Sequence, residues 1–160
     1  MDPFTITEIE PGDREALAAI WTAHFGAPVV VTRGRLVDPR TLPGFAARQD
    51  GRVIGAATYE VTGDQAEIVT LDSIAEDQGV GTALLDRVVS WARGQGLRRL
   101  WLISTNDNLR ALGFYQKGGW SMVALYRDAV EESRKLKPEI PATGVDGIPI
   151  QHEIELELLL

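Results

Sequence analysis

The sequence predicts a mixed α/β (α+β) fold, with helices flanking a mostly antiparallel central sheet of about seven strands. Three patterns favour this class. Alternating segments separated by turn signals at Asp50–Gly51 and Gly63–Asp64 are typical of a strand meander. A long amphipathic helix between two apolar strands indicates one parallel βαβ unit. The last segment alternates strictly, as a half-buried strand does.

The first expected elements are a strand and a helix. Residues 4–10 alternate, Pro11–Gly12 turns the chain, and Asp13 can cap a helix that Gly26 ends. His24 lies on the apolar face of this helix. We interpret it as a core-edge residue, because its neighbours on that face are apolar.

A meander of antiparallel strands follows over residues 28–37, 43–61 and 66–74. If the first of these strands is regular, Arg33 and Arg35 point to the same side.

The second half begins with a helix over residues 80–93, whose apolar residues recur at helical spacing. Residues 97–104 then form a short apolar strand. A second, shorter helix is expected over residues 106–116, ended by Gly118–Gly119, and a further strand over residues 120–127.

The final segment predicts a strand with one core face and one acidic, solvated face. The loop over residues 137–149 leads into it, and His152 falls on its core-facing side as a structural histidine. The core positions are Ile150, His152, Ile154, Leu156 and Leu158, and they alternate with Gln151, Glu153, Glu155 and Glu157.

Size and composition favour one globular domain over residues 1–160, since 44% of the 160 residues are hydrophobic and 24% are charged. The first five residues, MDPFT, are expected to be disordered or foreign to the domain. No apolar run approaches the roughly 20 residues of a membrane span, and the N-terminus lacks a signal-peptide pattern. We therefore expect a cytoplasmic protein that does not bind membranes.

The titratable residues exclude several chemistries. The chain has no cysteine, so disulfides and thiolate nucleophiles are excluded, and its two histidines are too far apart in sequence to suggest a metal site. The formal charge of −7 argues against a nucleic-acid binder.

A glycine turn precedes the long helix. Gly79 and Gly81 are poor helix formers, but they let a ligand approach the unpaired amides of a first helical turn, which is a binding site for phosphate. An ordinary turn is the alternative. Rossmann and Walker phosphate loops are excluded, because Leu84 stands where a third glycine is needed and Thr82 where a lysine is needed.

Two motifs resemble the GNAT superfamily of N-acetyltransferases. The signature Q/R-x-x-G-x-G/A falls on residues 76–81, and N-x-x-A-x-x-F-Y is matched by Asn108, Ala111, Phe114 and Tyr115. The element order is similar over residues 5–127, with the final segment as a seventh strand. The resemblance implies a GNAT-like acyl-CoA N-acyltransferase fold with acetyl-CoA as cosubstrate and no metal.

The resemblance also implies how coenzyme A is bound. Backbone groups of Leu71 and Ser73 would pair with the pantetheine arm, and Asn108 would bind the cofactor or cap its helix. Glu76 departs from the family's Gln or Arg, so either it points away from the pyrophosphate or it weakens binding. The amides around the pyrophosphate would be those of Gln78, Gly79, Val80, Gly81 and Thr82.

For catalysis, the resemblance implies that the Tyr115 hydroxyl protonates the departing thiolate; a buried structural aromatic is the alternative. Asp72 and Glu67 are the candidate bases, and a solvated surface role explains each equally well. The absence of cysteine favours direct attack by the amine in a ternary complex.

The acceptor is expected to be a primary amine of a small molecule or peptide. Arg33 could bind an acidic group of this acceptor, and Asn106 could form a hydrogen bond with it.

Two other functions stay open: an acyl-CoA-binding sensor or interaction module with weak or no turnover, and an α/β domain with an unrelated phosphate ligand. Pairing of two copies through their final strands is also left open.

Overall fold

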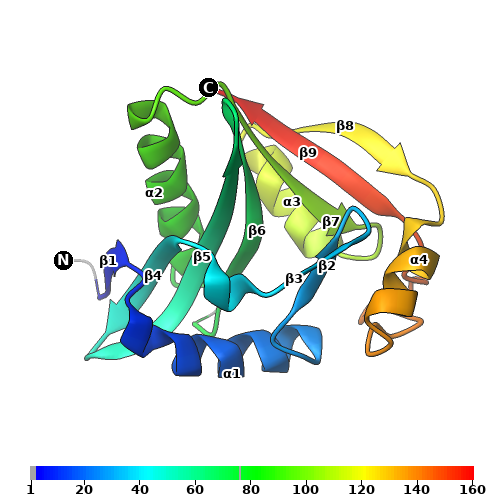
Figure 1. The fold of residues 1–160 in the computed structure, drawn as a ribbon, viewed down its shortest axis with the longest axis horizontal. Coiled ribbons are helices and arrows are strands. Elements are labelled where there is room, and N and C mark those ends of the chain that lie inside the picture. The colour runs from blue at the N-terminus through cyan, green and yellow to red at the C-terminus, as the bar shows by residue number, and fades with distance from the viewer. Residues whose placement is uncertain (1–2, 76) are drawn as a thin grey trace.

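The computed structural model describes residues 3–75 and 77–160 and confirms the predicted class. A mixed sheet of seven strands forms the centre, and only the β6–β7 pair is parallel (Figure 1). Thr5 begins β1 and Phe4 packs against the central core, so these two residues belong to the fold. In spatial order the strands are β1 (Thr5–Glu8), β4 (Gly44–Gln49), β5 (Arg52–Thr62), β6 (Gln65–Ser73), β7 (Arg99–Thr105), β9 (Glu153–Leu159) and β8 (Ser121–Tyr126).

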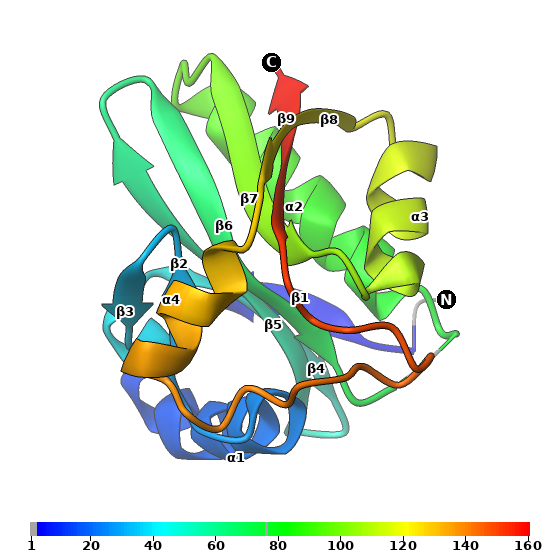
Figure 2. The same ribbon diagram turned by 90° about the vertical axis from the view of Figure 1, so that its right-hand side faces the viewer.

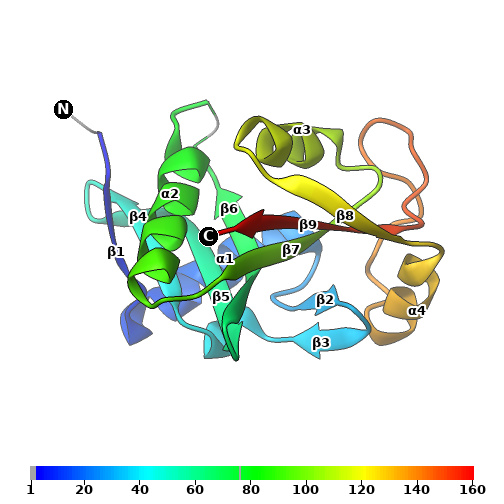
Figure 3. The ribbon, with the colours of Figure 1, turned by 90° about the horizontal axis from the view of Figure 1, so that it is seen from above.

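Helices cover both faces of this sheet, and α1 and α2 lie on opposite sides of it (Figure 3). In the part of the chain that the structure describes, no helix has the length and apolarity needed to cross a bilayer. The described residues form four α-helices, α1 (Arg14–Phe25), α2 (Val80–Gly94), α3 (Leu109–Lys117) and α4 (Ala129–Leu136), and single 3-10 turns occupy Pro11–Asp13 and Pro39–Thr41.

Apolar burial on the two faces explains this layering. The main core lies between the sheet, α2 and α3, and its fully buried members include Leu84, Val88 and Leu156. On the opposite face, Leu17 and Trp21 of α1 pack against Ala56 of β5. The alternation of β5 thus serves both layers, which fixes the register of the central strands.

The prediction of one regular strand over residues 28–37 is wrong. The chain forms a separate hairpin there, with β2 (Val30–Thr32) paired to β3 (Arg35–Val37). Arg33 and Gly34 form the turn with φ of 48° and 74°. Two consecutive residues with positive φ are the geometry of a tight hairpin turn, so Arg33 and Arg35 do not share a regular strand face.

The sequence patterns did not indicate α4. The helix is short and polar, and only Val130 and Ser133 are buried, so it lacks the apolar stripe that marks α2. The Val130 N–H donates to the Gln151 carbonyl at 3.1 Å, which ties α4 to the entry of β9.

The last strand is shorter, and its acidic face less exposed to solvent, than predicted. It begins at Glu153, not at Ile150, and it runs between β7 and β8. Its acidic face is not solvated: Arg99 forms ion pairs with both Glu155 and Glu157, and Glu153 is 3% exposed. The strands on both sides of β9 supply donors to this face, Arg99 from β7 and Tyr126 from β8, so its carboxylates are paired instead of hydrated.

His152 was expected within the strand on its core side, and it lies one residue before β9 instead. Its Nδ1 accepts a hydrogen bond from the Asp128 N–H at 2.9 Å. The histidine therefore supports the turn into α4, and its role is structural, as predicted.

A buried ion pair fastens the start of α1 to the sheet. Arg48 of β4 donates from Nη1 and Nη2 to the two carboxylate oxygens of Asp13, at 2.7 and 2.6 Å. These bonds hold the pKa of Asp13 below its ordinary value, although burial opposes the shift. Because Asp13 is 7% exposed, its charge depends on Arg48 for compensation.

We expect Asp13→Asn to lower the free energy of unfolding at pH 7 by about 2 kcal/mol, because Arg48 loses a charged partner. The folded-state pKa of Asp13 is depressed, so its contribution is present above the ordinary pKa of 3.8 and is lost as the pH falls through the lowered value. Urea unfolding at pH 7 and pH 3 should show the two proteins converging at the lower pH. Asp64→Asn, in an exposed pair with Arg98, is the control. An equal loss in both variants would contradict the assignment.

Candidate active site

A cleft opens where β6 and β7 separate. The two strands pair only from Gln65↔Arg99 to Glu67↔Trp101, although both continue further. Beyond this point the register between β5 and β6 shifts, because Tyr59 pairs with Ile68 and Thr58 with Thr70, leaving Val69 as an extra residue in β6. Such a bulge bends a strand and increases its twist. The bulge therefore lies where β6 parts from β7.

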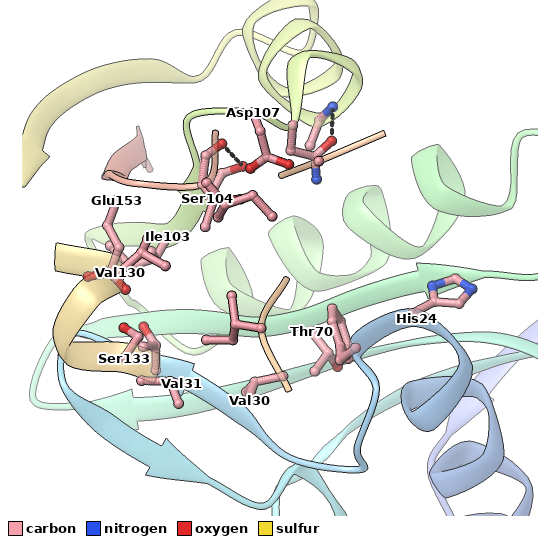
Figure 4. Close-up of a pocket in the computed structure, with 18 of the residues that line it drawn as sticks. His24, Val30, Val31, Thr70, Ile103, Ser104, Asp107, Val130, Ser133 and Glu153 are labelled. Atoms are coloured by element: carbon pink, nitrogen blue, oxygen red, sulfur yellow. Dashed lines mark hydrogen bonds between the residues drawn. The ribbon is translucent and has the colours of Figure 1, made fainter. Parts of the chain in front are cut away.

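The cleft has a volume of about 780 Å³, which is enough for a small ligand. Figure 4 shows His24 and Thr70 on one wall, and Ser104 and Asp107 on the opposite one. The end of α1, the β2 strand, α3, α4 and the segment over residues 137–149 complete the walls. Of the predicted site residues, Glu67, Leu71, Asp72, Asn108 and Tyr115 line this cleft.

The glycine turn lies at the N-terminus of α2, just beyond the end of β6. Gly79 has a φ of 77°, and a Cβ built on it would meet nothing within 4 Å, so the outer side of the turn is open. The first helical hydrogen bond runs from the Ala83 N–H to the Gly79 carbonyl. The preceding amides of Val80 to Thr82 thus have no acceptor within the helix. The predicted role of Glu76 lies outside the described residues.

The turn residues 78–82 do not line the cleft itself, whereas Leu71 and Asn108 do. Asn108 caps α3, since its Oδ1 accepts from the Ala111 N–H at 3.1 Å. The Ser73 hydroxyl accepts from the Ala75 N–H at 3.0 Å and so helps to turn the chain toward α2. The side chains of Asn108 and Ser73 therefore already have structural roles, and their binding of a cofactor stays a prediction.

Tyr115 projects from α3 toward the cleft. It packs against Phe114 and Trp120, with ring centroids 5.2 and 5.5 Å away, and it is 8% exposed. Burial raises the pKa of the Tyr115 hydroxyl strongly, and the negative charge of Asp72 raises it further. Tyr115 therefore keeps its proton at neutral pH, as a general acid must before the reaction.

Asp72 connects β6 to the end of α1. Its Oδ1 accepts a hydrogen bond from Nδ1 of His24 at 3.1 Å, while its Oδ2 is buried and has no hydrogen-bond partner among residues 3–75 and 77–160. An unpaired buried carboxylate oxygen is costly, so this atom is suited to a donor brought by a ligand. His24 also lines the cleft, so it contributes to the candidate site, although its apolar neighbours on the helix had indicated only a core-edge role.

Glu67 is the other candidate base, and both of its carboxylate oxygens already lie near donors. The Thr32 hydroxyl donates to its Oε2 at 2.6 Å, and its Oε1 lies 3.7 Å from Nη2 of Arg35. Burial raises the pKa of Glu67, and these two neighbours partly oppose the shift. Neither Asp72 nor Glu67 is a solvated surface residue, because both are less than 10% exposed.

The two predicted acceptor-binding residues lie outside the cleft lining and have other partners. Arg33 donates to Oε1 of Glu153 at 3.1 Å, and its guanidinium carbon lies 3.4 Å from the centre of the Tyr126 ring. The Asn106 amide bonds only to backbone: Oδ1 accepts from the N–H groups of Gln151 and His152, and Nδ2 donates to the Pro149 carbonyl. Their predicted contact with an acceptor is untested.

The segment over residues 137–149 forms the far wall of the cleft, and the sequence indicated only a loop there. Arg134 of α4 connects the first half of this segment to the residue that follows it, since Nη2 donates to the carbonyls of Pro141 and Ile150 at 2.7 Å each. On the α1 side, Nζ of the buried Lys137 donates to the Val29 carbonyl at 2.8 Å. Figure 2 shows this segment running past α1 on its way from α4 to β9.

Comparisons with known proteins agree with this geometry. The model of the acetyltransferase (GNAT) family matches residues 10–120. YdhI of Bacillus subtilis is 41% identical over 142 residues, which cover 88% of this chain and 89% of YdhI.

Two solved structures show the same fold. A GNAT family acetyltransferase from Elizabethkingia anophelis with acetyl-CoA bound aligns over 100% of both chains with a TM-score of 0.74 at 18% identity. The ribosomal-protein-S18-alanine N-acetyltransferase from Escherichia coli aligns with a TM-score of 0.70 at 19% identity, over 98% of this chain and 93% of that one. The family match covers more than half of the chain, and the glycine turn, the separated strands and Tyr115 lie within it. The chain therefore belongs to the GNAT family of acetyltransferases.

Proposed function

We propose that the protein transfers an acetyl group from acetyl-CoA to a primary amine of a small molecule or peptide, by direct attack in a ternary complex. The observation that carries this proposal is the placing of Asp72 and Tyr115 in one cleft between the separated strands β6 and β7. One is a proton acceptor and the other a proton donor, and aminolysis of a thioester needs both.

The residues present fit coenzyme A. The open side of Gly79 and the unpaired amides of Val80 to Thr82 offer donors for a pyrophosphate at a helix N-terminus. Beyond Glu67, the edge of β6 that faces β7 is no longer paired with that strand, so Leu71 and Ser73 can offer backbone groups to the pantetheine arm. When bound, acetyl-CoA supplies the activated acetyl thioester.

Asp72 is the better of the two candidate bases. Its Oδ2 has no hydrogen-bond partner, whereas both oxygens of Glu67 face donors. We propose that Oδ2 takes a proton from the acceptor ammonium, and that the neutral nitrogen then forms the new C–N bond. As the C–S bond breaks, the Tyr115 hydroxyl gives its proton to the leaving sulfur. No covalent bond to the protein is needed.

A relative supports an amine as acceptor. The [ribosomal protein bS18]-alanine N-acetyltransferase of Escherichia coli is 27% identical over 86 residues, which is about half of each chain. We propose that this protein likewise acts on an amine, in the cytoplasm and without nucleic acid or membrane as a partner. An acyl-CoA-binding sensor with weak or no turnover would be favoured if Glu76 weakened the binding of coenzyme A, and no feature of residues 3–75 and 77–160 favours it.

Acetyl-CoA should raise the melting temperature. At about 100 times its Kd, a ligand stabilises the folded state by roughly 2.7 kcal/mol, which corresponds to about 5 °C or more for a domain of this size. Differential scanning fluorimetry measures the shift, with ATP as the control nucleotide that lacks pantetheine. An equal shift with ATP would favour an unrelated phosphate ligand, and no shift at millimolar acetyl-CoA would contradict the proposal.

Tyr115→Phe should lower kcat by roughly 10- to 10,000-fold, because the hydroxyl that protonates the sulfur is removed. The melting shift caused by acetyl-CoA should persist, since the ring stays in place. A thiol-release assay measures kcat, and the cysteine-free protein gives no background. Tyr126→Phe is the matched control, because that hydroxyl bonds to Glu155 outside the cleft. Unchanged turnover in Tyr115→Phe would remove this residue from the mechanism.

The same assay should distinguish the roles of the two candidate bases. Asp72→Asn should lower kcat by roughly 100- to 10,000-fold, whereas Glu67→Gln should keep most of it, because the amide can still accept from Thr32. A raised pH should partly rescue Asp72→Asn, since more of the acceptor is then neutral. If Glu67→Gln loses the activity and Asp72→Asn keeps it, the roles are reversed.

A further inference from the structure

We propose that the acceptor is a linear polyamine, a small molecule whose second ammonium group is bound apart from the one that reacts. This inference rests on the proposed function and specifies the substrate class of the same cleft. It follows from two carboxylate oxygens that lack partners, from the charge of the lining, and from the way residues 137–149 close the cleft.

Among the described residues, two buried carboxylate oxygens on opposite walls find no hydrogen-bond partner: Oδ2 of Asp72 on β6 and Oδ1 of Asp107 after β7. Asp72 is 8% exposed, so water cannot compensate its charge freely. Figure 4 shows Asp107 on the wall opposite Thr70 and His24. Each oxygen accepts hydrogen bonds only, and an ammonium group, with three donors and a positive charge, satisfies it best.

The rest of the lining favours a cation as well. Among the described residues, the cleft is lined by six carboxylates but by only one arginine and one lysine, Arg110 and Lys137. Burial lowers the pKa of Lys137, and its Nζ donates to the Val29 carbonyl. Arg110 lies 3.3 Å from Asp77, in the turn before α2. The carboxylates belong to Glu67, Asp72, Asp107, Glu139, Asp146 and Glu153.

An acidic group on the acceptor would be repelled. Arg33, the residue expected from the sequence to receive such a group, is bound to Glu153, and Arg35 is bound to Glu60 at 2.6 Å. Neither arginine lines the cleft. The six carboxylates of the lining outnumber Arg110 and Lys137, so a carboxylate on the acceptor would be repelled, whereas polyammonium ions are attracted from solution by the same field.

Two of the acidic groups, Asp72 and Glu139, lie beside the end of α1. Asp72 bonds to His24, and a Cβ built on Gly26 would lie 3.4 Å from the Cβ of Glu139. Glu139 belongs to the segment over residues 137–149, and Asp107 packs against that segment as well, because a Cβ built on Gly144 would lie 2.2 Å from the Asp107 Oδ2. A ligand between the two walls thus meets Asp72 on one side. On the other side it meets Asp107 and residues of the 137–149 segment.

The far wall selects a small molecule over a polypeptide. The segment is tied to the α1 side by the Lys137–Val29 bond and to the β7 side by the Asn106–Pro149 bond, at 2.8 and 2.9 Å. A wall fastened on both sides blocks passage of an extended chain across the cleft. A flexible polyamine needs room only for its own length, and the cleft volume of about 780 Å³ provides it.

The test compares acceptors at saturating acetyl-CoA by thiol release. Spermidine should show a kcat/KM at least ten-fold above n-butylamine, and the advantage should fall as ionic strength rises. Glycylglycine, which carries a carboxylate, should be the poorest acceptor. Equal or better turnover of n-butylamine or glycylglycine would overturn the assignment, and so would a lysine-free tripeptide amide that exceeds spermidine.

Variants locate the second ammonium group. Asp107→Asn and Glu139→Gln should each lower kcat/KM for spermidine several-fold through KM while leaving n-butylamine unchanged. Glu139 is exposed, so its variant tests the idea even if Asp107→Asn is unstable. Glu131→Gln, on α4 but outside the cleft, is the matched control and should change neither acceptor. Equal losses for both acceptors would indicate a merely structural effect and contradict a second ammonium site.

A binding measurement separates the two proposals. Calorimetry should detect spermidine binding to the protein alone, and Asp107→Asn should weaken it. If acetyl-CoA neither binds nor reacts but spermidine binds, the proposed acetyl transfer fails and the cationic site stands. If acetyl-CoA is consumed with other amines while spermidine neither binds nor reacts, the polyamine assignment fails alone.

Discussion

The arrangement of the molecule depends on one interrupted contact, the pairing between β6 and β7. Two strands joined by a helical crossover would ordinarily continue as neighbours, but here they share a ladder only as far as Glu67 and Trp101. Each strand keeps its other neighbour: β6 stays paired with β5 as far as Ser73, and β7 stays paired with β9 along its whole length. The separation is therefore held by two intact half-sheets, and the extra residue in β6 places the bend.

Holding the strands apart leaves polar groups in a partly dry cleft, and the protein compensates some of them and not others. Glu67 and Glu153 are supplied with donors from the β2–β3 hairpin and its turn. Asp72 and Asp107 each keep one oxygen without a partner. Elsewhere the buried charges of Asp13 and of the β9 glutamates are matched by arginines. The contrast supports the proposal that the uncompensated oxygens belong to ligand binding and not to stability.

Much of the fold was predictable, because hydrophobic period and turn residues act locally. Local patterns correctly predicted three features: a strand over residues 66–74, the apolar stripe of α2 and a helix cap at Asn108. The glycine turn was indicated by Gly79 and Gly81 before the long helix, whereas Tyr115 was found through motif resemblance. The β2–β3 hairpin was missed because Arg33 adopts a positive φ that side chains seldom take, and α4 because a short polar helix has little periodicity. His24 acquires its partner Asp72 only through tertiary packing, across 48 residues, which no local pattern reports.

The clamps on the segment over residues 137–149 have a consequence for how such a protein can change. Arg134 and Asn106 hold it through the main-chain carbonyls of Pro141 and Pro149, which every replacement retains. Apart from Lys137, whose side chain binds the Val29 carbonyl, the side chains in the segment that face the cleft can therefore be exchanged without loosening its attachment. Anchoring by main-chain atoms and the proposed recognition by side chains are thus largely separate, so a new acceptor preference can arise here while the glycine turn and the central sheet stay as they are.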